Sequence, residues 1–215
     1  MPTEPRQFED DLRHAVYLRD GYKCAYTGKV DTTYTGKRMS LDHIDPIHTG
    51  GAMQNKKDGL DNGRATNLTT AFGRTNSAKG KKSKEAWSAY AKNIAPPKAG
   101  LKFEWKEIED GAKEPLDLKR GAELSKLAKQ ARDARRLDAN GDRTIETPKS
   151  KAIAEKSKAI VESYQKEQAA KKAGPGVQHD PKDGRFTSAR AAVVAVARDI
   201  VRHLRARLWP GHPAA

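Results

Sequence analysis

Residues 41–80 carry the strongest indications of how this chain folds. Three motifs lie within this stretch: LDHIDP at 41–46, TNLTT at 66–70 and RTNSAKG at 74–80. β-prone residues at 38–44 predict a strand that carries the first motif. Thr66 or Asn67 is typical of a helix N-cap, which predicts a helix that runs to about Lys79 and is ended by Gly80. A strand and a helix in one short stretch indicate a mixed α+β fold.

Weaker patterns flank this stretch. Apolar residues at helical spacing predict helices, and short β-prone runs bounded by turn residues predict strands. The helices are expected over 8–18 and 83–93, and the strands over 22–26 and 98–105.

Composition divides the chain into three regions. The first, 1–105, is expected to be one domain with its motif core at 38–80. The second, 116–172, is rich in Ala, Lys, Arg and Glu but has few large apolar side chains, so we expect basic helices that bury little surface. The third, 185–209, carries an apolar stripe that predicts an amphipathic helix. That stripe suits a homodimer contact, a protein partner or docking on the core, and the sequence does not choose among them.

Charge and cysteine content restrict the class of protein. The 42 Lys and Arg residues exceed the 28 Asp and Glu residues and give a net charge of +14. This surplus favours a polyanionic partner such as nucleic acid, although it also suits any well-solvated surface. The single Cys24 excludes an internal disulfide and suits a reducing compartment. The sequence shows neither a signal pattern nor an apolar run long enough for a bilayer, so we expect a cytoplasmic protein with no membrane contact.

The three motifs combine side chains that suit phosphodiester hydrolysis. This reaction needs a base that deprotonates water and a cation that stabilises the phosphate and the leaving oxygen. His43 suits the first task, because a neutral imidazole has a pKa of about 6.5. Asp42 and Asn76 offer oxygen atoms to a hard cation, and Asn67 is suited to tying the 49–64 loop to the helix that follows. Each residue also has a plain structural interpretation, such as a surface histidine or a helix cap.

In this order, Asp42-His43, Asn67 and Asn76 resemble the HNH nuclease motif in its His-Asn-Asn form. The resemblance covers residues 18–80. It implies a ββα-metal fold, in which two strands and a helix surround one divalent cation. It further implies that His43 is the catalytic base, that Asp42 and Asn76 are the metal ligands, and that Asn67 is the structural asparagine.

The flanking residues add to the resemblance and also depart from it. RDGYKC at 19–24, the Gly pair at 50–51 and the NSAKG helix end at 76–80 are similar to the family's flanks. The family's zinc knuckle uses paired cysteines, whereas Cys24 stands alone and Thr27 occupies the partner position, so no structural zinc is expected. The third motif residue is Asn rather than His, and two oxygen ligands favour Mg²⁺ or Mn²⁺.

We therefore expect a metal-dependent endonuclease core followed by a mostly helical basic extension. Duplex DNA is the favoured substrate. Arg74 and Lys79, at the last motif, are candidates for contacting its phosphates, although a solvated charge explains either residue nearly as well. Two rivals remain: a non-catalytic nucleic-acid-binding protein that keeps the fold, and an assembly protein that uses the basic helices.

Overall fold

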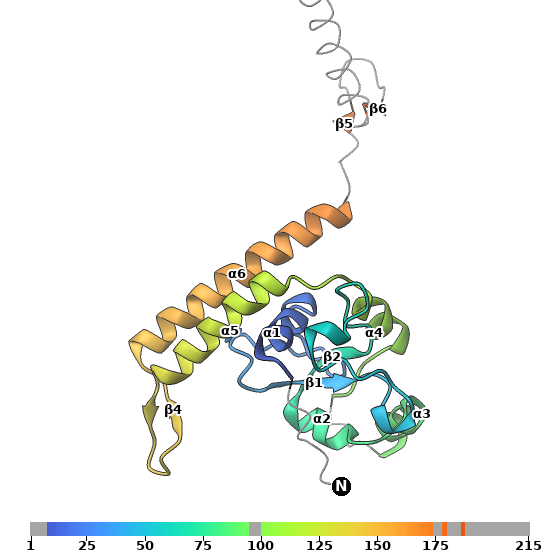
Figure 1. Cartoon of the computed structure of the whole chain (residues 1–215), viewed down its shortest axis with the longest axis horizontal. Coiled ribbons are helices and arrows are strands. Elements are labelled where there is room, and N and C mark those ends of the chain that lie inside the picture. Colours follow the sequence, from blue (N-terminus) through green and yellow to red (C-terminus); the bar gives the residue numbers. More distant parts are fainter. Residues whose placement is uncertain (1–7, 95–99, 174–177, 180–185, 188–215) are drawn as a thin grey trace, which may run out of the picture. The chain divides into compact units, whose positions relative to one another are not determined.

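The chain folds as two compact units, Met1–Gln165 and Lys166–Ala215. The structure, a computed structural model, describes residues 8–94, 100–173, 178–179 and 186–187 (Figure 1). Helices and strands both build the first unit, which confirms the mixed α+β class. The second unit contains a pair of short antiparallel strands, β5 (Gln178–His179) and β6 (Phe186–Thr187). The amphipathic helix expected over 185–209 lies outside the described residues from 188 onward.

A two-stranded antiparallel ribbon lies at the centre of the first unit. β1 (Met39–His43) pairs with β2 (Leu68–Phe72) so that Met39 lies opposite Phe72 and His43 opposite Leu68. The helix α2 (Gly73–Lys79) follows β2 without a loop. In Figure 1, α1 (Asp10–Arg19) and α2 lie on either side of this ribbon.

The predicted helix from Thr66 to Lys79 is therefore wrong in its first half. Residues 68–72 form β2, because the β-branched Thr69 and Thr70 pair with β1 and are buried there. Asn67 precedes a strand and is no N-cap. The helix begins only at Gly73, so Asn76 lies in its first turn rather than far along it.

Two of the flanking predictions are confirmed and two are wrong. α1 matches the expected helix at 8–18, and α3 (Lys84–Ala89), continued by the π turn η3 (Tyr90–Ile94), matches the one at 83–93. Residues 22–26 make only an isolated bridge, from Lys23 to Val30. Residues 101–104 form no strand; Lys102 N–H donates to the Tyr26 carbonyl at 2.8 Å, and α4 (Trp105–Ala112) begins directly afterwards.

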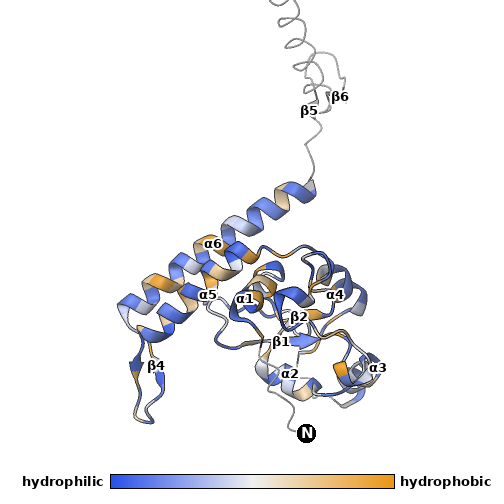
Figure 2. Cartoon of the chain, in the orientation of Figure 1, coloured by the Kyte–Doolittle hydropathy of each residue, from blue (hydrophilic) through white to orange (hydrophobic). Residues whose placement is uncertain are grey.

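The expectation that residues 116–172 bury little is also wrong. This segment forms α5 (Leu118–Asp133), the hairpin strands β3 (Arg136–Leu137) and β4 (Arg143–Ile145), and α6 (Pro148–Ala173). Figure 2 shows mainly hydrophilic residues on these elements. Even so, Leu124 of α5 and Val161 of α6 are fully buried against Leu12 and Val16 of α1.

A glycine lets α5 approach α1 closely. A Cβ atom at Gly121 would lie 2.6 Å from the Asp11 carbonyl oxygen, so only glycine fits at this crossing. α5 and α6 up to Gln165 therefore belong to the same compact unit as the motif core. The composition changes between residues 105 and 116, but the compact unit continues across this boundary. It does so because the few apolar residues of the extension pack on α1.

A second apolar cluster lies on the other side of the ribbon. It joins Ile44 and Ala71 to Tyr26, to Trp87 of α3 and to Ile108 of α4. The Tyr26 and Trp87 rings meet edge to face with their centroids 5.7 Å apart. The long loop between β1 and β2 contains two 3-10 turns, η1 (Ile47–Thr49) and η2 (Lys57–Gly59).

Candidate functional site

His43 is the last residue of β1, and its ring lies on the side of the ribbon that faces the N-terminal segment. The ring is partly exposed, and its centroid lies 5.5 Å from that of Phe8. The backbone carbonyl of His43 accepts a hydrogen bond from Lys79 Nζ at 2.8 Å. The candidate base thus lies at the end of a strand. Lys79 of α2 holds its main-chain carbonyl, and its imidazole lies beside the ring of Phe8.

Asp42 is on the opposite side of the strand, as the alternation of side chains requires. Its side chain is buried, and Tyr26 Oη donates a hydrogen bond of 2.5 Å to Oδ2. Lys79 Nζ lies 3.0 Å from the same oxygen. Burial raises the pKa of the Asp42 carboxyl, while the charge of Lys79 and the hydrogen bonds from Tyr26 and Lys79 oppose that rise. Burial and the nearby Asp42 carboxylate raise the pKa of Tyr26 well above its usual value.

Lys79 does not lie on the surface that the sequence suggested for it. The residue has 0% of its area exposed, and its ammonium group bridges Asp42 Oδ2 and the His43 carbonyl. A buried ammonium group needs such partners, because an unpaired charge in the interior is costly. Lys79 is therefore paired within the chain, and its buried ammonium group is not exposed for the phosphate contact that the sequence suggested. Arg74, the other proposed phosphate contact, is exposed near the start of α2.

Asn76 lies on α2 and bonds β1 at the two residues before Asp42. Its Nδ2 donates to Ser40 Oγ at 3.1 Å and to the Leu41 carbonyl at 2.8 Å. These bonds use the amide nitrogen, which leaves the amide oxygen as the atom able to act as a ligand. Asn76 and Lys79 are three residues apart and so share one face of α2.

Asn67 has the loop-tying role predicted for it, although no helix starts there. Its Oδ1 accepts a hydrogen bond from Asp45 N–H at 2.7 Å, and its Nδ2 donates to the carbonyls of Asp45 at 3.0 Å and Ala52 at 2.8 Å. The Ile44 N–H donates to the Asn67 carbonyl at 3.0 Å. Asn67 thus fixes the backbone after His43, through its main chain at Ile44 and through its side chain at Asp45.

Two residues that sequence reasoning did not assign complete this loop. Gln54 is buried, and its Oε1 accepts a hydrogen bond from the Asn67 N–H at 2.7 Å. A Cβ atom at Gly51 would lie 2.0 Å from the Asp45 carbonyl oxygen, so this position requires glycine. The Gly pair at 50–51 was a visible signal, whereas nothing near Gln54 in the sequence indicates its partner.

Arg19 and Asp20 support the second strand, and sequence reasoning gave them no role beyond resembling a flank. The Arg19 guanidinium donates to the carbonyls of Ala65, Leu68 and Ala112 at 3.1, 2.7 and 3.1 Å. It also pairs with Asp20, whose Oδ2 accepts the Thr70 N–H at 2.8 Å. A fork of five donors suits this task, since it can join several carbonyls at once.

The side-chain oxygen atoms of Asp42 and Asn76 are of the type that hard cations bind. Within the described ranges, no group of three or more His, Cys, Asp and Glu side chains is placed to hold a metal ion. Asp42 and Asn76 instead offer one carboxylate and one amide oxygen, a set that suits Mg²⁺, which keeps several of its water ligands. The ammonium group of Lys79 competes for the same carboxylate, so any such cation would be weakly held.

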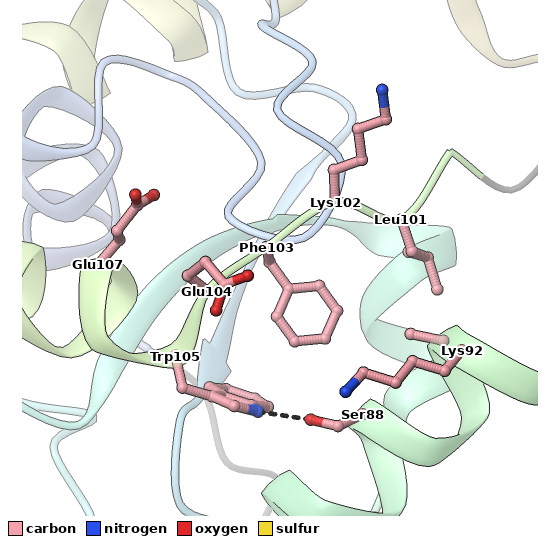
Figure 3. A pocket seen from close by; sticks show the side chains of 9 residues that line it. Ser88, Lys92, Leu101, Lys102, Phe103, Glu104, Trp105 and Glu107 are labelled. Atoms are coloured by element: carbon pink, nitrogen blue, oxygen red, sulfur yellow. Dashed lines mark hydrogen bonds between the residues drawn. The ribbon is translucent and has the colours of Figure 1, made fainter.

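A hollow of about 620 Å³ lies away from these residues (Figure 3). Phe103 and Trp105 line it, and Trp105 Nε1 donates to Ser88 Oγ at 2.8 Å. None of the motif residues borders it. The hydrogen bond and the ring contact between Trp87 and Phe103 describe packing of α3 against the start of α4 and the segment before it.

Comparison of the chain with protein-family models, with curated proteins and with solved structures finds no match. In the part of the chain that the structure describes, no helix has both the length and the apolar character needed to cross a membrane.

Proposed function

We propose that this protein is a divalent-metal-dependent endonuclease of the HNH type that hydrolyses phosphodiester bonds in duplex DNA. The observation that carries the proposal is the hydrogen-bonding of Asn67, whose main chain holds Ile44 and whose side chain holds Asp45 and Ala52 in the loop that follows His43. A base must be held in register with its substrate, because small displacements of a catalytic group cost large factors in rate. The strand pair followed by α2 is the arrangement that a ββα-metal nuclease would use.

Each residue has a role in this proposal. His43, as the neutral imidazole, accepts the proton of the attacking water. Asp42 and Asn76 would hold a divalent cation, which when bound stabilises charge on the phosphate and on the leaving oxygen. Lys79 and Tyr26 orient the Asp42 carboxylate, and Asn67 holds the loop. The net charge of +14 supports a polyanionic substrate.

The decisive experiment is cleavage of supercoiled plasmid with Mg²⁺ or Mn²⁺, with EDTA as the metal-free condition. We expect His43→Ala to slow cleavage at least about 100-fold, the usual contribution of a general base. The matched control is His48→Ala, which removes an exposed imidazole from η1 and is expected to leave the rate within about twofold of wild type. Folded His43→Ala protein that still nicks at the wild-type rate would contradict the assignment of the base.

The metal is tested separately. Asn76→Ala is expected to raise the Mg²⁺ concentration needed for half-maximal cleavage, whereas Ser77→Ala, at the exposed neighbouring position, is not. Activity that persists in EDTA would overturn the metal-dependent reaction as a whole.

A second function is favoured by one observation, the Lys79 ammonium group 3.0 Å from the carboxylate that should bind the cation. A site neutralised in this way suits a non-catalytic nucleic-acid-binding protein that keeps the fold. Plasmid that is bound but never nicked under any divalent metal would establish this alternative.

A further inference from the structure

A second, strongly basic hollow lies between α1 and α5. Its volume is about 500 Å³, within the range of small-molecule sites. The loop at 35–37 and the start of β1 close one side of it. Six cationic side chains line it: Arg13, Lys37, Lys126, Lys129, Arg132 and Arg135.

The other titratable groups of this hollow do not cancel that charge. Asp10 and Asp11 are its carboxylates, and Asp11 Oδ2 already lies 3.1 Å from Lys57 Nζ outside the hollow. His14 contributes no charge at neutral pH, because burial lowers its pKa to about 4. The imidazole is engaged instead with the Tyr22 hydroxyl, at 2.9 Å from Nδ1. The hollow is therefore a region of positive potential.

Two of the cationic side chains that line the hollow have buried guanidinium atoms. Arg135 is 7% exposed and follows α5 directly, and Arg13 is on α1 facing it. The Nε atoms of both guanidinium groups are buried, and neither has a hydrogen-bond partner within the part of the chain that the structure describes. An incompletely paired guanidinium group is costly away from bulk water, so both arginines favour an anion that enters the hollow and accepts from their terminal N–H groups.

We infer that the hollow between α1 and α5 is a binding site for a phosphate group, with the half-buried Arg13 and the buried Arg135 as the donors in its walls and Lys126 and Lys129 at its mouth. Phosphate fits better than a single carboxylate, because its oxygens can accept from two guanidinium forks while its charge offsets several cations. The lysines at the mouth are exposed, so the site can be reached from solvent.

The position of the hollow favours the DNA backbone as the source of this phosphate. Met39 borders it and His43 ends the same strand, so the two lie about 13 Å apart at 3.3 Å per residue. A duplex whose scissile phosphate lies at His43 can therefore also present a nearby phosphate of its backbone to the hollow. The assignment to the backbone of the cleaved DNA rests on the proposed function, whereas phosphate binding as such does not.

The first experiment measures binding of a labelled duplex to the full chain by fluorescence anisotropy across a salt series. Each DNA phosphate that the protein no longer neutralises should flatten the slope of log K against log salt by ~0.9, so Lys126→Gln/Lys129→Gln, which removes the mouth of one phosphate site, should flatten it by about 0.9. The matched control is Lys151→Gln/Lys156→Gln, which removes the same charge from exposed positions of α6. Equal slopes for the two double variants would overturn the assignment to DNA.

The second experiment uses inorganic phosphate as the probe and thermal unfolding as the readout. Phosphate should raise the unfolding temperature of the wild type above that in chloride of equal ionic strength, because a ligand of the folded state stabilises it. Arg135→Gln should weaken phosphate binding by about tenfold or more, since it removes a charge-assisted donor. An equal response of wild type and Arg135→Gln would overturn the phosphate site.

The outcomes separate the two proposals. A response to inorganic phosphate with an unchanged DNA slope would leave the site standing as one for a free phosphate compound and would reject the link to DNA. A flattened DNA slope in a protein that cleaves no plasmid would uphold the site and reject the nuclease.

Discussion

Polar contacts hold the segment around Asp42 and Asn67, whereas apolar side chains hold α5 and α6 against α1. In the first region single side chains make several directional bonds, as Asn67 does to Asp45 and Ala52. In the second, the fully buried Leu124 and Val161 contribute burial without fixing any particular atom. Directional bonds position groups for chemistry, and burial supplies the stability that such an arrangement needs. The basic extension is therefore part of the scaffold on which the site depends.

The largest effect is expected from cutting the chain after Lys113, which leaves α4 whole. This truncation removes α5 and α6 and exposes the α1 surface that covers Leu124 and Val161, so we expect loss of cooperative folding. Thermal unfolding followed by circular dichroism measures it. A chain cut after Ala173 keeps both helices and serves as the control. A cooperative transition in the shorter fragment at the control's temperature would show that the motif region folds alone.

Within the motif region, Asn67→Ala should lower the free energy of unfolding by about 4 kcal/mol. The change leaves the Asp45 N–H and the carbonyls of Asp45 and Ala52 without their partner, and each such loss costs about 1–3 kcal/mol. Urea denaturation gives the value. Asn140→Ala, at an exposed turn position, should change it by less than about 0.5 kcal/mol. Similar values for the two variants would refute the bracing role of Asn67.

In the extension, Leu124→Ala should cost about 3 kcal/mol, the usual loss for a buried leucine that leaves a cavity. Leu137→Ala is the matched control, because that side chain in β3 is 56% exposed. The same denaturation assay compares them. If Leu124→Ala were as mild as Leu137→Ala, α5 would not be packed on α1 in solution.

The smallest effect concerns pH. Burial lowers the folded-state pKa of His14 from 6.5 to about 4, so the unfolded chain binds the proton first as the pH falls. The neutral imidazole contributes its full stabilisation above pH 6.5, and this contribution is lost as the pH falls from 6.5 to 4. At pH 5 the free energy of unfolding should already be lower by about 2 kcal/mol. Denaturation at pH 7 and pH 5, with His14→Gln as the comparison, isolates this contribution. A wild type and a variant with the same pH dependence would exclude it.

The sequence predicted those features that depend on neighbours along the chain. The strand at 39–43 and the helix α1 follow from local patterns, and the role of Asn67 from its place after a loop. The helix wrongly predicted from Thr66 shows the limit, because Thr69 and Thr70 become a strand only when β1, some distance away in sequence, pairs with them.

The charged part of the site could not be predicted for the same reason. Lys79 and Asp42 are 37 residues apart, and no local pattern indicates that the ammonium group of one is buried against the carboxylate of the other. Tyr26, whose hydroxyl bonds the same carboxylate, likewise looked like part of a strand. Burial of the extension was missed because composition counts apolar residues without showing that they share one face.

The burial of Lys79 makes it a natural reporter of local opening. An amine-reactive reagent modifies the exposed lysines of this chain at once, but it reaches Lys79 only when α2 separates from β1. The labelling rate at this residue, followed by peptide mass spectrometry, therefore measures how often the site opens. A divalent cation that displaced the ammonium group from Asp42 would accelerate that labelling, so the same measurement would detect metal binding without any substrate.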